Sequence, residues 1–175
     1  MALDGTLEAS SIVAQGEVTV SGALTVAGDF TVAYGTIDLE RGTVAVGGRF
    51  DSQGGFVFGS GEIDGNLTNA GWLSIGSLTI NGDYTQTASG RLSVRLRSAS
   101  DFDQLVVTGF ATLDGTLDTS LANGYQPQAG DQLQVIEFGA GTGAFSHLTG
   151  NAPLFGVLYV YSPRPDVQPG VTLLF

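Results

Sequence analysis

Two residue types are missing from this chain altogether. It has no cysteine, which excludes a disulfide framework and any metal site built on thiolates. It also has no lysine, so all six of its basic residues are arginine. Against them stand 17 acidic residues, which give a net charge of −11. Such a field repels phosphates and anionic lipid surfaces, so we expect neither nucleic acid nor a membrane surface as a partner.

Helical and membrane signals are absent as well. No stretch of useful length repeats its apolar residues with the period of a helix, and no apolar run is long enough to span a bilayer. Residues 1–20 lack a basic start followed by an apolar run. We therefore expect no membrane insertion by this segment. Because Met1 directly precedes a repeated motif, we also expect the chain to be an excised piece of a longer polypeptide.

Glycine is abundant, with 27 residues in 175, and it recurs in one short motif. The motif is apolar-x-Gly-x-apolar, with copies at 3–7, 20–24, 63–67, 107–111 and 113–117 and longer versions at 24–30, 44–50 and 78–84. This composition produces several copies by chance, so the spacing is the stronger observation. Gly28, Gly48, Gly65 and Gly82 are separated by 20, 17 and 17 residues. Near-constant spacing of similar strands is typical of a solenoid.

Within each copy the residues alternate as in a strand with one buried side. We predict that Leu78, Ile80, Leu92 and Val94 point inward, and that Thr79, Asp83 and Arg95 point outward. The predicted fold is all-β: a parallel β-helix, or solenoid, with coils of 17–20 residues. A left-handed hexapeptide solenoid is the competing fold, because Ile12, Val18, Leu24 and Phe30 are six residues apart, although Thr36 interrupts that series.

The repeat pattern of the sequence changes after Arg97. The stretch SASDFD interrupts the repeat, and three longer apolar segments follow at 132–138, 154–161 and 170–175. The bare edge at the end of a solenoid templates aggregation unless it is covered. We therefore divide the chain into β-solenoid coils at 1–97 and, at 98–175, the final coils and a C-terminal β cap that also seeds folding.

Residues 71–150 resemble the C-terminal part of the β-helical passenger domain of bacterial autotransporter-type surface proteins. The residues that carry the resemblance fall in three groups: Gly82, Asp83, Tyr84, Gln86, Gly90 and Leu92; Asp103, Leu105, Val107, Gly109, Ala111, Leu113, Gly115 and Leu117; and Pro127, Gly130 and Asp131. The resemblance implies a right-handed parallel β-helix that ends in a cap. It also implies secretion to a bacterial cell surface, Gram-negative in type, and it brings no catalytic residues with it.

Few residues are candidates for chemistry. Asp101 and Asp103 form an Asp-x-Asp pair without the later acidic residue and glycine of a calcium loop. Ser146 and His147 are adjacent, but the sequence places no carboxylate to orient the histidine, as a Ser/His nucleophile requires. We therefore predict no catalytic residue, no metal site and no cofactor. We expect Asp101 and Asp103 to lie in a corner where their carboxylates accept backbone hydrogen bonds, and His147 to lie in a turn of the cap.

Two further groups of residues recur with the repeat. Four acidic residues, Asp29, Asp51, Asp64 and Asp83, fall near equivalent places in successive coils, with Arg49 the only base among them. We expect them to form a solvated outward row. The aromatic residues Phe30, Phe50, Phe56, Phe58 and Tyr84 are expected to stack in the interior. Trp72 lies outside that register, either on the surface against a sugar or partner, or over a coil corner.

Taken together, the sequence predicts a non-enzymatic structural or adhesive stem module of a secreted or cell-surface β-helical protein. Its expected partners are surface glycans or proteins of host or neighbouring cells. One alternative is a self-associating fibre subunit, because 3–10 and 113–120 are nearly identical and could substitute for one another in edge-to-edge association. The other is a polysaccharide-active β-helix enzyme that uses aligned acidic residues.

Overall fold

The computed structural model describes residues 2–7, 11–151, 155–161 and 168–175, with side chains from residue 11 onward. All regular structure in these residues is β, as predicted, and no helix occurs among them. The strands are β1 (Ala2–Leu7), β2 (Ser11–Ala14), β3 (Glu17–Val26), β4 (Asp29–Val32), β5 (Thr36–Asp38), β6 (Thr43–Ser52), β7 (Phe56–Asn69), β8 (Trp72–Asn81), β9 (Tyr84–Gln86), β10 (Arg91–Leu96), β11 (Gln104–Leu113), β12 (Thr116–Leu121), β13 (Gln132–Gly143), β14 (His147–Gly150), β15 (Gly156–Val160) and β16 (Gly170–Leu174).

The strands pair in parallel to form three ladders, which we call faces 1, 2 and 3. Face 1 contains β2, β4, the ends of β6 and β7, β9, and the ends of β11 and β13. Face 2 contains the starts of β1, β3, β7 and β8 together with β5, β10, β12 and β14. Face 3 contains the ends of β1, β3 and β8, the starts of β6 and β11, and the middles of β7 and β13.

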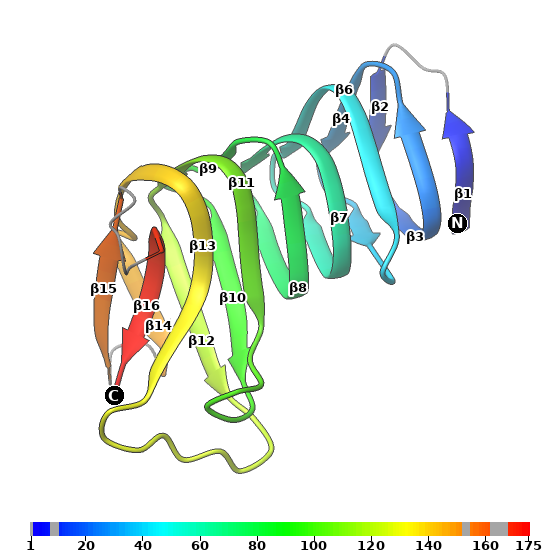
Figure 1. The fold of residues 1–175 in the computed structure, drawn as a ribbon. Coiled ribbons are helices and arrows are strands. Elements are labelled where there is room, and N and C mark those ends of the chain that lie inside the picture. The colour runs from blue at the N-terminus through cyan, green and yellow to red at the C-terminus, as the bar shows by residue number, and fades with distance from the viewer. Residues whose placement is uncertain (1, 8–10, 152–154, 162–167) are drawn as a thin grey trace.

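One passage of the chain through the three faces is called a rung. Figure 1 shows the rungs stacked along one axis, with the two ends of the chain at opposite ends of the stack. Paired residues are 16 to 20 positions apart from β1 to β10, close to the predicted 17–20. From β11 onward they are 25 to 31 apart, because the chain carries extra loops at 97–103 and 122–131.

Apolar side chains line the inside of each face in continuous rows. The face 1 row is Ile12, Phe30, Phe50, Leu67, Tyr84 and Ala111; the face 2 row is Val18, Ile37, Val57, Leu73, Leu92 and Leu117; and the face 3 row is Leu24, Val44, Ile63, Ile80, Val107 and Phe138. All but Ile12 are buried. The predicted inward residues Leu78, Ile80, Leu92 and Val94 are buried, and Asp83 and Arg95 are exposed, as expected. Thr79, also predicted outward, is half-buried.

Glycine stands at all three corners where the chain passes from one face to the next. Between faces 3 and 1 the column is Gly28, Gly48, Gly65, Gly82, Gly109 and Gly139; between faces 1 and 2 it is Gly16, Gly35, Gly55, Gly71, Gly90 and Gly115; and between faces 2 and 3 it is Gly22, Gly42 and Gly61. A Cβ atom at Gly82 would lie 2.5 Å from the carbonyl oxygen of Gly65. The repeated motif is therefore a corner motif, used at each of the three corners.

The C-terminal end of the stack departs from parallel pairing. β13 pairs in parallel with β11 and antiparallel with β16, and β16 pairs antiparallel with β15. Leu133, Val171 and Leu173 of this layer are fully buried. The three apolar segments of the tail thus supply an antiparallel layer, although residue 154 of the second segment lies outside the described residues. Parallel pairing continues as far as β14.

A buried polar network crosses the interior beside the corner between faces 1 and 2. The Tyr84 hydroxyl donates to Gln86 Oε1 at 2.7 Å, and Asn69 Nδ2 donates to the Tyr84 oxygen at 3.5 Å. Gln86 Nε2 donates to the carbonyl oxygens of Asp114 and Thr116, one rung further on. Burial raises the pKa of Tyr84, so the phenol stays protonated as a donor. The network ties two faces and three rungs together.

We predict that Gly82→Ala destabilises the protein by about 1–3 kcal/mol or more, because the new Cβ would overlap the backbone of the preceding rung. The matched control is Gly16→Ala, since no atom of the other described residues, its two chain neighbours apart, lies within 4 Å of a Cβ placed there. Urea unfolding of the two variants measures the difference. Equal stability of the two variants would contradict the corner contact.

We also predict that Tyr84→Phe lowers the free energy of unfolding by about 1–3 kcal/mol, because the buried Gln86 oxygen loses its donor. Tyr34→Phe serves as the control, since Tyr34 is 85% exposed and its hydroxyl can bond to water. Thermal and urea unfolding report both changes. A Tyr84→Phe variant as stable as Tyr34→Phe would show that the network adds nothing.

Candidate functional site

The four acidic residues expected in one row do not share one. Asp29 and Asp83 hold equivalent outward positions on face 1, each just before a buried aromatic residue. Asp51 also lies on face 1, but two strand positions further along, and Asp64 lies on face 3. The prediction of equivalent positions is therefore wrong for Asp51 and Asp64. Spacing along the sequence misplaced them because rungs differ in length.

Asp29 and Asp83 instead serve the corner between faces 3 and 1. Asp29 Oδ1 accepts the backbone N–H of Arg49 at 2.8 Å, and Asp83 Oδ1 accepts that of Phe110 at the same distance. Asn66 does the same for the N–H of Asp83, also at 2.8 Å. Each side chain thus binds the backbone of the next rung, where the ladder is interrupted by the corner. The Gly-Asp and Gly-Asn pairs of the motif are structural.

Asp101 and Asp103 lie in the extra loop at 97–103 and have different surroundings. Asp103 is 1% exposed and accepts bonds from Arg95, through the backbone N–H at 2.9 Å and Nε at 3.1 Å, and from Arg97 Nη1 at 2.6 Å. Asp101 pairs with Arg97 Nε at 2.9 Å. Asp103 thus accepts a backbone N–H in a corner, as expected, whereas the bond to the Asp101 carboxylate comes from the Arg97 side chain. Among the described residues no cluster of metal-ligating side chains occurs.

Ser146 and His147 lie beside a carboxylate that the sequence did not indicate. The Ser146 hydroxyl donates to Asp114 Oδ1, and the Gly115 N–H donates to the same oxygen at 2.7 Å. These two bonds hold the pKa of Asp114 below its ordinary value, and nearby His147 acts in the same direction. His147 is the first residue of β14, so its placement in a turn was wrong. Because the Ser146 proton bonds the carboxylate rather than the imidazole, the arrangement is not a nucleophilic triad.

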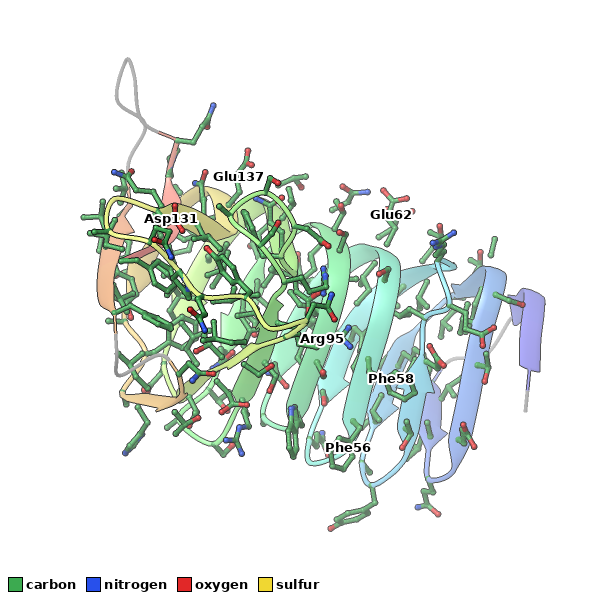
Figure 2. All side chains as sticks on the ribbon, turned by 90° about the horizontal axis from the view of Figure 1, so that it is seen from below. Phe56, Phe58, Glu62, Arg95, Asp131 and Glu137 are labelled. Atoms are coloured by element: carbon green, nitrogen blue, oxygen red, sulfur yellow. The ribbon has the colours of Figure 1, made fainter. Side chains whose placement is uncertain are left out.

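Phe56 and Phe58 were predicted to lie inside, and the structure corrects both. Phe30, Phe50 and Tyr84 are fully buried, as expected, but Phe56 is 45% exposed and Phe58 is half-buried. The reason is the strand period, since the intervening Val57 takes the inward position on face 2. Phe56 and Phe58 therefore lie side by side on the outside of that face. Figure 2 shows both on the surface.

Trp72 follows Phe56 in the next rung of face 2 and forms with it and Phe58 what we call the aromatic stripe. The ring centroids of Phe56 and Trp72 are 5.2 Å apart, and the Arg91 guanidinium carbon lies 4.8 Å from the Trp72 centroid. Trp72 Nε1 donates to Ser93 Oγ at 2.7 Å. The indole is thus held between an aromatic ring and a cation. It is 36% exposed, so it lies on the surface, one of the two places expected for it.

Beyond Arg91 the same face carries a polar cluster of Arg91, Ser93, Asp118 and Thr149. Arg91 Nη2 bonds Asp118 Oδ1 and Thr149 Oγ1, each at 3.1 Å. Thr149 Oγ1 donates to the same Asp118 oxygen at 2.5 Å, and Ser93 bonds the other at 3.4 Å. Sequence reasoning missed this cluster, because the pairs that bond within it are 25 to 58 residues apart. The aromatic stripe and the polar cluster form the candidate functional site.

A comparison with protein-family models finds no match, and a search of curated proteins finds no similar sequence. In the part of the chain that the structure describes, no helix is long and apolar enough to cross a membrane.

The loop at 122–131 generates a prediction about pH. Asp131 Oδ2 accepts the Gln128 N–H at 2.9 Å and the Tyr125 hydroxyl at 2.8 Å, which lowers the pKa of Asp131 in the folded state. Partial burial and this carboxylate raise the pKa of Tyr125 to about 12. A carboxyl whose pKa is lowered by folding stabilises the fold above its unfolded pKa of about 3.9, and that contribution is lost as the pH falls further.

We therefore predict that Asp131→Asn lowers the urea midpoint at pH 7 and that this deficit is smaller at pH 3. Urea unfolding of both proteins at pH 7, 5 and 3 measures this convergence. A deficit of equal size at all three pH values would mean that the Asp131 charge contributes nothing to the loop.

Proposed function

We propose that this chain is a right-handed parallel β-helix that serves as a non-enzymatic stem in a secreted or cell-surface protein, of the kind found in autotransporter passengers. The observation that carries this proposal is the continuous register of the three ladders. The same three inward rows run from β2 or β3 to β11, β12 or β13 while the rung length changes from 16 to 31 residues. Such a stack extends by adding rungs.

The residues that carry the resemblance also support the proposal, because their contacts give them structural roles. Asp83 bonds the backbone of the next rung, Gln86 joins the buried network, and Asp131 closes the loop at 122–131. Tyr84 and Leu92 are fully buried. The handedness and the export to a bacterial surface rest on the resemblance.

The two alternatives receive less support. An enzyme with aligned acidic residues would need several carboxylates on one patch, and Asp51 and Asp64 lie on different rows. A fibre built by exchange of the two similar segments would need them at equivalent corners. Residues 3–7 pass from face 2 to face 3, whereas 113–117 pass from face 1 to face 2, and residues 8–10 lie outside the described residues.

The sharpest test of the stem is deletion of one whole rung. Phe56 and Trp72 are paired partners 16 residues apart, so removing Phe56–Gly71 joins Gly55 to Trp72 at an equivalent position of the corner. We predict that this variant stays folded and unfolds cooperatively. Its long axis should shorten by about 4.8 Å, the spacing between strands. Circular dichroism and small-angle X-ray scattering measure both.

The control for this deletion is removal of half a rung, Phe56–Ile63, which puts the corner residues Asp64 and Gly65, and then the face 1 end of β7, onto face 2. That variant should not fold, because apolar and outward positions no longer match across the ladders. A whole-rung deletion that unfolds as completely as the half-rung deletion would sink the stem proposal.

A further inference from the structure

We propose that face 2 binds a neutral polysaccharide chain, which lies on the aromatic stripe and reaches the polar cluster. This inference deepens the proposed function, and rests on it, by assigning the adhesive surface of the stem and the class of its ligand. Of the large apolar side chains exposed in the described residues, Phe56 and Trp72 are adjacent across a ladder, whereas Val13 and Phe110 lie on face 1. Contiguous exposed apolar side chains with a polar surround mark binding surfaces.

The aromatic stripe suits the apolar side of a sugar ring. Pyranose rings present C–H groups on their faces, and these pack against aromatic rings. Trp72 is covered on its two sides by Phe56 and Arg91, so it offers mainly its edge. Phe56 is the first residue in the series Phe56, Trp72 and Arg91. It is 45% exposed and has the small Thr36 as its neighbour in the preceding rung. We assign the principal sugar contact to Phe56, with Trp72 beside it.

The stripe is also fixed in place before any ligand arrives. Trp72 is held by the hydrogen bond to Ser93 and by contacts with the rungs on either side. A surface whose side chains are already ordered loses little conformational entropy on binding. The polar cluster is ordered in the same way by its four mutual bonds. Its adjacent donors and acceptors suit the neighbouring hydroxyls of a sugar.

Charge selects a neutral polymer over an acidic one. Both arginines that β10 presents outward already pair with carboxylates, Arg91 with Asp118 and Arg95 with Asp103. Neither arginine is therefore free to bind uronate or sulfate groups, and the net charge of −11 repels such groups. In Figure 2, Glu62 and Glu137 lie at the opposite margin of the view from Phe56, whereas the acidic Asp38 is the ladder partner of Phe58 in the preceding rung.

The two extra loops give independent support. Both follow strands of face 2, the first after β10 and the second after β12, and Figure 1 shows them projecting from the same side of the stack. Insertions in repeat proteins commonly gather on the binding face. Within the second loop the side chains before Asp131 are uncharged, and those of Asn123, Gln126 and Gln128 can bond hydroxyl groups. The loops would extend the contact beyond the polar cluster.

Affinity electrophoresis in native gels tests this proposal. The probes are three neutral polysaccharides, glucomannan, xyloglucan and galactomannan, and the acidic polygalacturonate. We expect retardation by at least one neutral polymer and none by polygalacturonate. Phe56→Thr introduces the residue type found at the equivalent position of the preceding rung, Thr36. It should weaken binding about tenfold, the equivalent of about 1.4 kcal/mol. Trp72→Thr should also weaken it.

The matched control is Phe110→Thr, because Phe110 is 43% exposed but lies on face 1. It should leave retardation unchanged, and melting curves of all variants check that they fold. No retardation of the wild type by any neutral polymer would overturn the proposal, as would an equal loss in Phe110→Thr. Sedimentation showing a dimer that Phe56→Thr abolishes would also overturn it, since a second copy would then occupy face 2. If the whole-rung deletion variant folds, any of these results would contradict polysaccharide binding without contradicting the stem proposal.

Discussion

Contact between backbones at the corners is the constraint on which the rest of this structure depends. Stacked strands lie about 4.8 Å apart, and where the chain turns, the corner residue lies directly over a carbonyl of the rung before it. At Gly42, Gly71 and Gly82 a Cβ would come within 2.3 to 2.5 Å of that oxygen. Glycine columns at three corners therefore fix where each face begins. Once the corners are fixed, strand alternation decides which side chains are buried.

Much of this could be predicted from the sequence, because alternation and glycine spacing are local signals. Leu78 and Ile80 were placed inside from their own strand alone. The positions of Asp51 and Asp64 could not be predicted in this way, since a row is defined by the corner and not by a count of residues.

Polar side chains in this protein are mostly used within the stack. Asp29, Asn66 and Asp83 bind the backbone of the next rung, and Asp103 binds two arginines. A buried carboxylate is tolerated when charged donors surround it. The candidate site differs from these structural contacts, because Phe56 and Trp72 are exposed, whereas Phe30, Phe50 and Tyr84 lie in the buried row of face 1. The sequence around Phe56 does not show whether its side chain is buried or exposed. Only the register of the strand shows that Val57 points inward and Phe56 outward.

The three parallel ladders also determine how the stack responds to force. Hydrogen bonds between rungs run along the stacking axis, so a pull spread over a whole end rung loads all three ladders together. A pull on the chain terminus loads a single strand and removes it bond by bond. Such a stack resists force that is applied across whole rungs at both ends. It loses its strands one after another when force is applied to the chain terminus alone. The antiparallel layer of β15 and β16 lies at the C-terminal end, so a pull on that end of the chain would first have to separate these strands.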